Sequence, residues 1–481
     1  MEALAAGCLL PGFVGTRPPD WLLRRIAGGL GGVTLFARNV TDPQQVAELT
    51  ARLHAERPDM LVAIDEEGGD VTRLEARRGS SYPGNLALGA AGDVALTRAV
   101  AAALGADLAA AGVDLDLAPV ADVNSNPDNP VIGVRSFGAD PDLVAAHVAA
   151  FVEGLQTQGV AACAKHFPGH GDTSADSHTD LPVVGGGARE LEAALLPFRA
   201  AIRVGVRAIM TGHLLVPTLD GEPATLSRPI LTGLLRERLG FAGLVVTDGL
   251  EMAAVRATVG LEEGAVRALA AGADAVCVGG GLAGEDTVDL LAGALAAAVR
   301  GGRVPEQRLA EAAGRVAGTA RWAAQHRSPV SPADAGVGLE AARRALRASG
   351  VERLPGSPMV VELRPPPGFA AGAVPWGLGA LLAERDAAAT VLRLDGPDGV
   401  PAALAAAAGR PLVVVGRDLH RHAAHAAAAG ALLAARPDAV VVEMGLPHRP
   451  PAGARAYVAT HGAGRVNALA AADLLCPGVR T

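Results

Sequence analysis

The densest group of reactive side chains lies in residues 165–178, KHFPGHGDTSADSH. The segment holds three histidines, two aspartates and one lysine. Gly169 and Gly171 permit backbone angles that regular elements do not use, and Pro168 interrupts helices and strands. We therefore expect a loop, following a strand, that is shaped to present these polar side chains.

One chemistry that fits this loop is metal binding. The possible ligands are His166, His170 and His178 together with Asp172 or Asp176. Their spacing matches no usual zinc pattern, and Lys165 would place a positive charge beside the ion. Metal binding therefore stays the weaker interpretation, and we expect neither a metal nor another cofactor.

The other chemistry is acid–base catalysis. Asp176 lies two residues before His178, close enough for its carboxylate to bond one ring nitrogen and leave the other for a substrate. Such a carboxylate selects the imidazole tautomer and stabilises the imidazolium of a group that titrates near neutral pH. The plain alternative is that His178 is an ordinary loop histidine.

A second candidate site is the segment Leu244–Met252, LVVTDGLEM. An apolar run ends in Asp248, and Gly249 follows it. A carboxylate at that point is well placed to attack an anomeric carbon, and a nucleophile with a separate proton donor is the minimum for retaining glycoside hydrolysis. The alternative is that Asp248 caps the next helix.

Other polar residues near the ends of apolar runs suit a sugar ligand. Asp65 can accept hydrogen bonds from hydroxyls, and Arg73, Arg135, Lys165 and His166 can donate to hydroxyl or carbonyl oxygens. Three asparagines in the segment DVNSNPDNP are first of all turn formers and only then candidate ligands: Asn124, Asn126 and Asn129.

The apolar runs that carry these residues recur with helical stretches between them. They are Gly32–Phe36, Leu61–Asp65, Val113–Val120, Ala161–His166, Ala208–His213, Leu244–Asp248 and Ala273–Val278. Most are continuously apolar, as strands covered on both faces are. Thr41-Asp42-Pro43 predicts the start of a helix over Gln44–His54. The pattern favours a (β/α)8 TIM-type barrel, one strand short of eight, whose strand ends meet on one face.

The pattern changes after the barrel. We expect a catalytic barrel over residues 1–324, a linker over 325–338 and an α/β sandwich domain over 339–481. In the second domain a helix is expected over Leu339–Ala348. The expected strands are Met359–Leu363, Thr390–Leu394, Leu412–Val415, Ala439–Met444 and Ala456–Thr460, with a helix over Ala423–Ala435.

Composition excludes several classes of protein. The net charge of −8, without a long basic run, argues against nucleic-acid binding. No apolar stretch reaches the length of a membrane span, and the N-terminus lacks the basic region of a secretion signal. The four scattered cysteines predict reduced thiols. We expect a cytoplasmic protein that is a monomer or a weak homodimer.

Residues 165–178 closely resemble the loop signature of the β-N-acetylglucosaminidase branch of glycoside hydrolase family 3, which acts on N-acetylglucosamine in peptidoglycan fragments. Further resemblances, in family order, are Gly31–Asn39, Ile64–Arg73, Asp122–Gly138, Leu244–Met252 and the C-terminal stretch Ala439–Leu475. The resemblance implies that Asp248 is the nucleophile and that Asp176 and His178 form the acid/base dyad.

The same resemblance implies that Asp65, Arg135, Lys165 and His166 hold the non-reducing sugar. Two positions depart from the family. Glu66 stands where Gln is usual and adds a negative charge near the site, and Gly249 replaces an acidic or small residue. Neither change removes a catalytic group.

We therefore expect a retaining exo-β-N-acetylglucosaminidase that acts on muropeptides or chitin oligosaccharides. The alternatives are a family 3 β-glucosidase, a β-N-acetylglucosaminide phosphorylase, a metal-dependent hydrolase and a sugar sensor without turnover. A neutral imidazole base tolerates incoming phosphate better than a carboxylate would, which keeps the phosphorylase open. Gly377-Leu378-Gly379 lacks the third glycine of a dinucleotide fingerprint.

Overall fold

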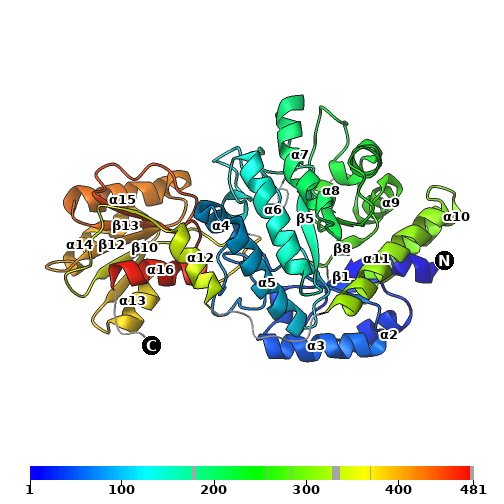
Figure 1. The fold of residues 1–481 in the computed structure, drawn as a ribbon, viewed down its shortest axis with the longest axis horizontal. Coiled ribbons are helices and arrows are strands. Elements are labelled where there is room, and N and C mark those ends of the chain that lie inside the picture. The colour runs from blue at the N-terminus through cyan, green and yellow to red at the C-terminus, as the bar shows by residue number, and fades with distance from the viewer. Residues whose placement is uncertain (176–179, 257, 283, 328–335, 369, 477–481) are drawn as a thin grey trace.

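The structure is a computed structural model that describes residues 1–175, 180–256, 258–282, 284–327, 336–368 and 370–476. The chain forms two sheet-centred bodies, and the N-terminus lies at the far side of the first body from the second (Figure 1). The sequence predicted both bodies. Residues 176–179, which hold part of the predicted acid/base loop, lie outside the described residues.

The first body is a (β/α)8-type barrel of eight parallel strands. They are β1 (Leu9–Pro11), β2 (Gly32–Leu35), β3 (Leu61–Ile64), β4 (Leu115–Asp116), β5 (Ala161–Phe167), β6 (Ala208–Thr211), β7 (Leu244–Thr247) and β8 (Val276–Val278). Strands β2 to β7 pair in chain order, and β1 pairs with β8. The pair is joined to β7 by a bridge between Val246 and Ala275. On the other side, the Gly31 amide donates to the Ala6 carbonyl oxygen at 2.9 Å.

Strand β1 is the eighth strand that the sequence pattern did not reveal. It has three residues and ends in Pro11, so it shows no periodicity of its own. Its partner β8 defines it, with Leu9 opposite Val276 and Leu10 opposite Cys277. The other seven expected strands are present. Most of them end one or two residues before the end of the predicted run, so the last residues of those runs lie in the loops.

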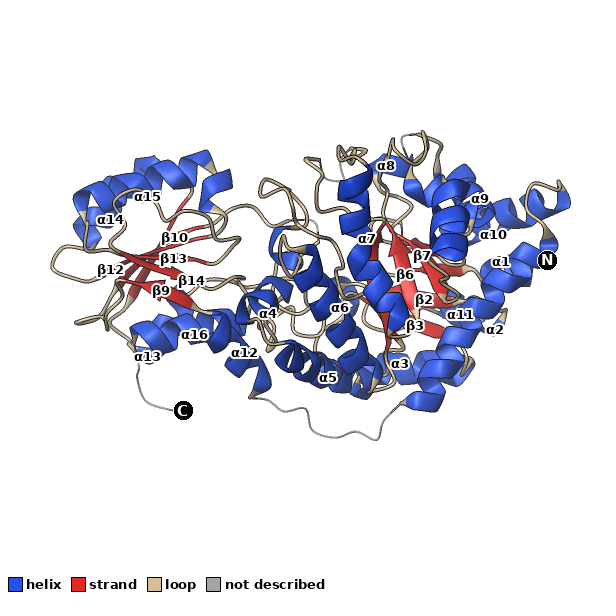
Figure 2. Ribbon diagram, turned by 45° about the horizontal axis from the view of Figure 1, so that its top comes forward, coloured by secondary structure: helices blue, strands red, loops and turns tan. Residues whose placement is uncertain are grey.

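Helices surround the barrel (Figure 2). They are α1 (Glu2–Ala6), α2 (Asp20–Ala27), α3 (Pro43–Glu56), α4 (Asn85–Ala91), α5 (Val94–Ala110), α6 (Pro141–Gln156), α7 (Ala188–Arg203), the π-helix η4 (Pro229–Arg238), α8 (Ala253–Arg256), α9 (Leu261–Ala271), α10 (Glu285–Arg300) and α11 (Glu306–His326). The helix predicted over Gln44–His54 is confirmed as α3. Its first turn is capped by Asp42, whose carboxylate accepts a hydrogen bond from the Gln45 amide at 2.9 Å.

The barrel has one closed end and one open end. Val316 and Ala320 of α11 pack into the barrel interior with Leu61, Leu115 and Leu244, which begin or lie near the beginning of their strands. Helix α11 therefore covers the amino-terminal end of the barrel. The carboxyl-terminal end stays open for a ligand, as in other barrels of this kind.

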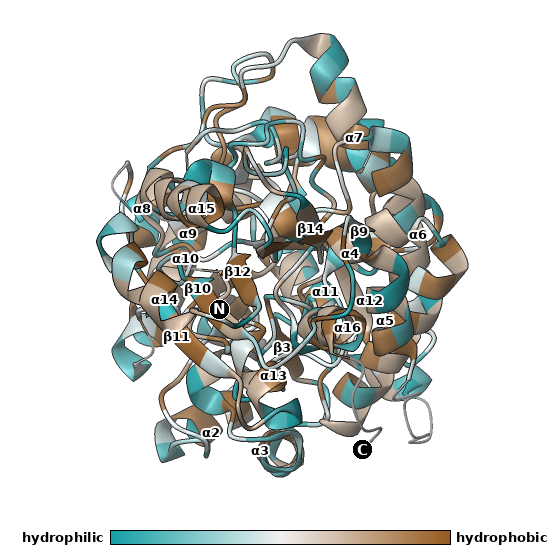
Figure 3. Ribbon diagram, turned by 90° about the vertical axis from the view of Figure 1, so that its left-hand side faces the viewer, coloured by the Kyte–Doolittle hydropathy of each residue, from teal (hydrophilic) through white to brown (hydrophobic). Residues whose placement is uncertain are grey.

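The second body is a six-stranded sheet with helices on both faces. Its strand order is β11 (Thr390–Leu394), β10 (Met359–Leu363), β12 (Leu412–Gly416), β13 (Val440–Glu443), β14 (Ala456–Ala459) and β9 (Arg347–Ser349). The helices are α12 (Val337–Ala345), α13 (Gly379–Arg385), α14 (Val400–Ala406), α15 (Ala423–Ala435) and α16 (Arg465–Leu475). The inner strands of the sheet are apolar, as Figure 3 shows for β10, β12 and β14. The sandwich predicted from the sequence is confirmed.

One boundary in this body was predicted wrongly. The helix expected over Leu339–Ala348 ends at Ala345, and β9 follows it at Arg347. This strand pairs antiparallel with β14 at the edge of the sheet. All three of its residues are exposed, so it carries no apolar signal in the sequence.

The carboxyl ends of the second sheet face the barrel. The Asp70 carboxylate of the barrel lies 2.5 Å from the Arg417 guanidinium and accepts a hydrogen bond from the Ala463 amide at 2.7 Å. A side chain at Gly464 would approach the backbone of Gly69 within 2.9 Å. The two bodies therefore meet in a close contact that is polar here and apolar at α12, whose Val337 and Ala341 belong to the core of the barrel. In the described residues no helix is both long and apolar enough to cross a membrane.

Candidate active site

A cavity of about 850 Å³ opens at the carboxyl end of the barrel strands. Its walls include six of the residues singled out from the sequence: Asp65, Arg73, Arg135, Lys165, His166 and Asp248. They come from four different strands or their following loops, far apart in the sequence. The remaining two candidates, Asp176 and His178, lie outside the described residues.

Asp248 is the first residue after β7. Its amide donates to the Thr211 carbonyl oxygen of β6 at 3.1 Å, and its carboxylate accepts a hydrogen bond from the Gly249 amide at 2.8 Å. The next helix begins only at Ala253, so Asp248 is not its N-cap. The residue is partly exposed and lines the cavity, where its carboxylate can meet a ligand.

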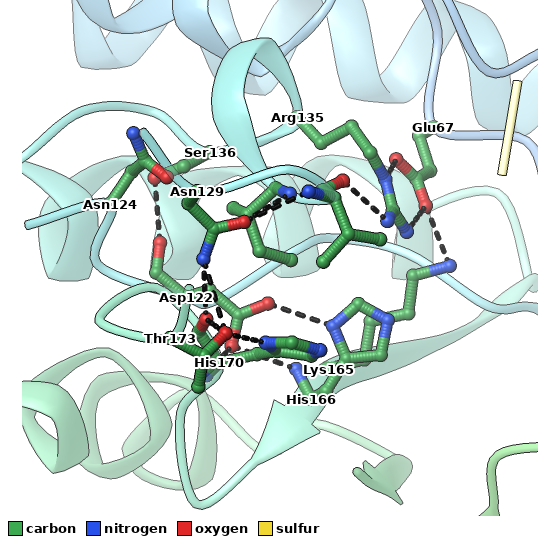
Figure 4. A network of polar contacts seen from close by, with 12 residues as sticks. Glu67, Asp122, Asn124, Asn129, Arg135, Ser136, Lys165, His166, His170 and Thr173 are labelled. Carbon is green, nitrogen blue, oxygen red and sulfur yellow. Dashed lines mark hydrogen bonds and ion pairs between the residues drawn. The ribbon is translucent and has the colours of Figure 1, made fainter. Parts of the chain in front are cut away.

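A buried ion network forms one wall of the cavity (Figure 4). The Arg135 guanidinium donates two hydrogen bonds to the Glu67 carboxylate, at 2.9 and 2.7 Å. The Lys165 ammonium lies 2.7 Å from both the Asp65 and the Glu67 carboxylates. The side chains of Lys165 and Glu67 are only 2% and 3% exposed. These ion pairs thus fix both cations in the cavity wall.

Charge pairing decides the protonation of this network. Burial alone would raise the pKa of Glu67, but the Arg135 and Lys165 cations outweigh it and hold that pKa well below its usual range. Burial would also lower the pKa of Lys165, but the Asp65 and Glu67 carboxylates raise it above the ordinary lysine value. Glu67 and Lys165 are therefore both charged at neutral pH.

Glu67 was not singled out from the sequence. It lies two residues after Asp65 in the segment following β3, and residues at that spacing in an extended chain project to the same side. This spacing is the signal that could have identified it.

The departure noted at Glu66 has a different consequence from the one expected, because Glu66 does not line the cavity. The Glu66 carboxylate instead binds the backbone of the segment that follows it. It accepts hydrogen bonds from the amides of Arg73 and Leu74, at 2.7 and 2.9 Å. Burial raises its pKa to about 7 against the hydrogen bonds that it accepts. Glu66 therefore holds the segment that carries Arg73 and adds no charge to the cavity wall. The Arg73 guanidinium donates to the Ala370 carbonyl oxygen of the second body at 2.8 Å.

His166 is oriented by a buried carboxylate. Its Nδ1 donates to Asp122 at 2.7 Å, which leaves Nε2 for a ligand in the cavity that His166 lines. The other oxygen of Asp122 accepts a hydrogen bond from the His170 amide at 2.7 Å. The His170 ring bonds Thr173 at 2.7 Å, and burial lowers its pKa to about 4.

The loop after β5 is attached to its neighbours on both sides of the undescribed residues. Asn129 donates to the His170 carbonyl oxygen at 2.8 Å, and Asn126 donates to that of Thr173 at 3.1 Å. Beyond the gap, the Val184 amide donates to the Leu215 carbonyl oxygen at 2.9 Å. The ends of the predicted acid/base loop are thus fixed over the open end of the barrel.

The asparagines act as turn formers. Asn129 Oδ1 accepts hydrogen bonds from the amides of Val131 and Ile132, and Asn124 Oδ1 accepts one from Gly133. Among the described residues, no three histidine, cysteine, aspartate or glutamate side chains gather in a way that could hold a metal ion. Two members of the metal set considered from the sequence, Asp176 and His178, lie outside the described residues.

A family model described as the glycosyl hydrolase family 3 N terminal domain matches residues 25–319. The chain belongs to glycoside hydrolase family 3. It is 40% identical over 264 residues to β-hexosaminidase A of Pseudoalteromonas piscicida, a match that covers 50% of this chain and 44% of that protein. The chain thus spans less than half of that relative's length.

Two further likenesses cover more of the related protein. The β-hexosaminidase of Methylococcus capsulatus is 40% identical over 254 residues, which is 52% of this chain and 75% of that protein. The family 3 β-N-acetylglucosaminidase from Paenibacillus sp. str. FPU-7 has a solved structure with a TM-score of 0.89 and 32% identity, covering 100% of this chain and 97% of that one. As a member of this family, the chain is a glycoside hydrolase.

Proposed function

We propose that this family 3 member is a retaining exo-β-N-acetylglucosaminidase. The observation that carries the proposal is the cavity that Asp248 shares with the buried network of Asp65, Arg135 and Lys165. A carboxylate that can bond carbon then lies beside fixed groups that can orient a sugar. The similarity to a β-hexosaminidase and to a family 3 β-N-acetylglucosaminidase supports the same assignment.

The proposed reaction has two displacements. In the first, the Asp248 carboxylate bonds the anomeric carbon, the bond to the leaving oxygen breaks, and His178 gives its proton to that oxygen. In the second, the neutral His178 takes a proton from water, and the water oxygen displaces Asp248 from the anomeric carbon. Asp176 orients the imidazole and stabilises its charged form in the first step.

The terminal N-acetylglucosamine would bind in the ion network. Asp65 would accept hydrogen bonds from its hydroxyls, while Arg135, Lys165 and His166 would donate to its oxygens. Arg73 stands at the rim, beside the second body. The proposed substrates are peptidoglycan-derived or chitin oligosaccharides, which carry such a residue at the non-reducing end.

Asp248→Asn tests the nucleophile. The substitution removes the covalent step, so turnover of nitrophenyl N-acetyl-β-glucosaminide and of chitobiose should both fall by about 10³-fold or more. Retention of more than a few per cent of the wild-type rate would reject the assignment.

In the wild type, a preference for the nitrophenyl β-glucoside over its N-acetyl analogue would favour the β-glucosidase alternative instead.

His178→Ala tests the proton donor. We expect a large loss with chitobiose, whose leaving group is poor, and a small loss with an activated aryl glycoside that needs little protonation. Equal losses on both substrates would argue against proton donation by this residue.

Activity of the wild type that disappears on exhaustive chelation would point to the metal-dependent alternative.

A further inference from the structure

The order of strands in the second sheet creates a crevice beside the active site. Strand β10 lies between β11 and β12. The connection that follows β10 therefore runs on one face of the sheet, and the connection that follows β12 runs on the opposite face. In open parallel sheets, ligands bind outside the carboxyl ends of the strands at such a point. Here that edge of the sheet faces the barrel, as the contact between Asp70 and Arg417 shows.

A cavity of about 270 Å³ lies at this place. Its second-body walls are Gly368, Ala370 and Ala371 after β10, and Arg417, Asp418 and Arg421 after β12. Barrel residues of the segments 70–71 and 130–135 form the opposite wall. It adjoins the active-site cavity, because both are lined by Val71, Val131, Arg135 and Ala370. A molecule that extends out of the active site on this side would enter it.

Most charges in this cavity are already engaged. Arg135 is bound to Glu67, and Arg417 to Asp70. One carboxylate oxygen of Asp418 accepts a hydrogen bond from the Leu446 amide at 2.7 Å. Arg421 differs, because its half-buried guanidinium has no hydrogen bond or ion pair with any residue that the structure describes.

A buried carboxylate binds the backbone of the loop that carries Arg421. Glu443, at the end of β13, accepts hydrogen bonds from the amides of Asp418 and Leu419, at 2.8 and 3.2 Å, and from that of Gly445 at 2.7 Å. Only 3% of Glu443 is exposed. These hydrogen bonds therefore fix the turn that carries the Arg421 guanidinium between the two bodies.

We propose that this cavity between the bodies binds the leaving-group sugar and that Arg421 recognises an oxyanion, a carboxylate, on that sugar. The inference rests on the proposed function for the position of the cleaved sugar at Asp248, and it adds that the leaving sugar lies toward Ala370, where the two cavities adjoin. A guanidinium without a partner matches a carboxylate in charge and in fork geometry. A neutral chitin unit would leave it unsatisfied. Arg421 would thus select substrates with an acidic leaving sugar.

The test compares two disaccharides that differ in one charge. They are N-acetylglucosaminyl-β-1,4-N-acetylmuramic acid, which has a free carboxylate, and its methyl ester. In the wild type we expect kcat/KM to favour the free acid. Arg421→Ala should lower the ratio of the two kcat/KM values about tenfold, mainly through KM, as the loss of a charge-assisted hydrogen bond does.

Arg353→Ala is the matched control. It removes the same charge from the second body, but Arg353 is exposed and lies beside a cavity at the opposite edge of the sheet, near Leu412 and Val440. This variant should keep the wild-type ratio. The proposal is overturned if the wild type does not distinguish acid from ester, or if Arg421→Ala lowers both values equally.

A free phosphate could supply the oxyanion instead. In that case inorganic phosphate would yield a sugar 1-phosphate, Arg421→Ala would remove this product, and the acid-to-ester ratio would not change. That result would overturn the assignment to the leaving sugar. Calorimetric binding of the free acid to Asp248→Asn protein tests the cavity without turnover. If the wild type has no glycosidase activity, but the free acid still binds tightly and Arg421→Ala weakens that binding, the proposed function is contradicted and this site is not.

Discussion

At the scale of single residues, two carboxylates of this cavity have opposite surroundings. Glu67 is enclosed between Arg135 and Lys165, so its oxygens are occupied and its pKa is held far below the ordinary value. Asp248 lies at the cavity surface, where its carboxylate can reach a ligand. The first fixes two cations, and the second is the carboxylate that we propose to bond carbon, although both side chains have similar chemistry.

Glu67→Gln should therefore damage stability as well as catalysis. The amide leaves two buried cations with one carboxylate partner fewer, and breaking a buried ion pair costs about 3–5 kcal/mol of unfolding free energy. Chemical denaturation measures this loss, and kcat/KM on chitobiose should fall at least tenfold. Glu56→Gln, which breaks an exposed pair with Arg52, is the control and should change stability by less than about 1 kcal/mol.

At the scale of elements, the strand ends position the chemistry. Asp65 follows the last residue of β3, Asp248 follows that of β7, and Lys165 lies within β5 near its end. Because neighbouring strands are parallel and in register, these ends form one rim. Glu66 then links β3 to the returning segment at Arg73, while its amide donates to Asp116 of β4 at 2.9 Å.

Glu66→Gln, which introduces the residue that the family resemblance implies at this position, should stabilise the protein at alkaline pH. Burial raises the pKa of Glu66 from 4.5 to about 7, so its contribution to stability is complete below pH 4.5 and is lost as the pH rises through 7. A glutamine oxygen can still accept from both amides. We expect the melting temperature to exceed that of the wild type by roughly 3 °C at pH 8.

The difference in melting temperature should shrink toward pH 5, where Glu66 is protonated in the folded protein. A thermal melt at several pH values measures it. Asp116, whose pKa burial also raises well above its ordinary value, faces Glu66 and remains in both proteins. A gap that is constant with pH, or that widens toward acid, would show that Glu66 is not the group that titrates.

At the scale of the whole molecule, the two bodies meet at the rim of the active site. Each has its own core, since the apolar residues of the second sheet form clusters separate from those of the barrel. Between them, Asp70 holds both Arg417 and the Ala463 amide, and Arg73 reaches Ala370. These polar contacts join the bodies together with the apolar packing of Val337 and Ala341 of α12 against the barrel.

Asp70→Ala should uncouple the two bodies. It removes the ion pair and the hydrogen bond at once and leaves Arg417 half-buried without its partner. Scanning calorimetry should show one transition for the wild type and two resolved transitions for the variant. Glu153→Ala breaks an exposed ion pair inside the barrel and should keep a single transition. Two transitions already present in the wild type would refute the coupling.

The sequence by itself determined most of the barrel, the sandwich and the outline of the site. Buried parallel strands are continuous apolar runs, and their polar ends reveal where the rim lies, so Asp65, Lys165, His166 and Asp248 could be identified in advance. The same logic could have included Glu67 from its spacing. Asp176 and His178 stay predictions, because residues 176–179 lie outside the described structure.

Only the tertiary structure decided the rest. Strand β1 has three residues and depends on β8 to complete it, and the edge strand β9 is polar because it is exposed. Whether Glu66 or Glu67 faced the cavity depended on the path of the chain after β3. The place of Arg421 at the rim was equally invisible, because it follows from how two separate sheets dock. Local patterns record burial and periodicity, whereas these features arise from contacts between segments distant in the sequence.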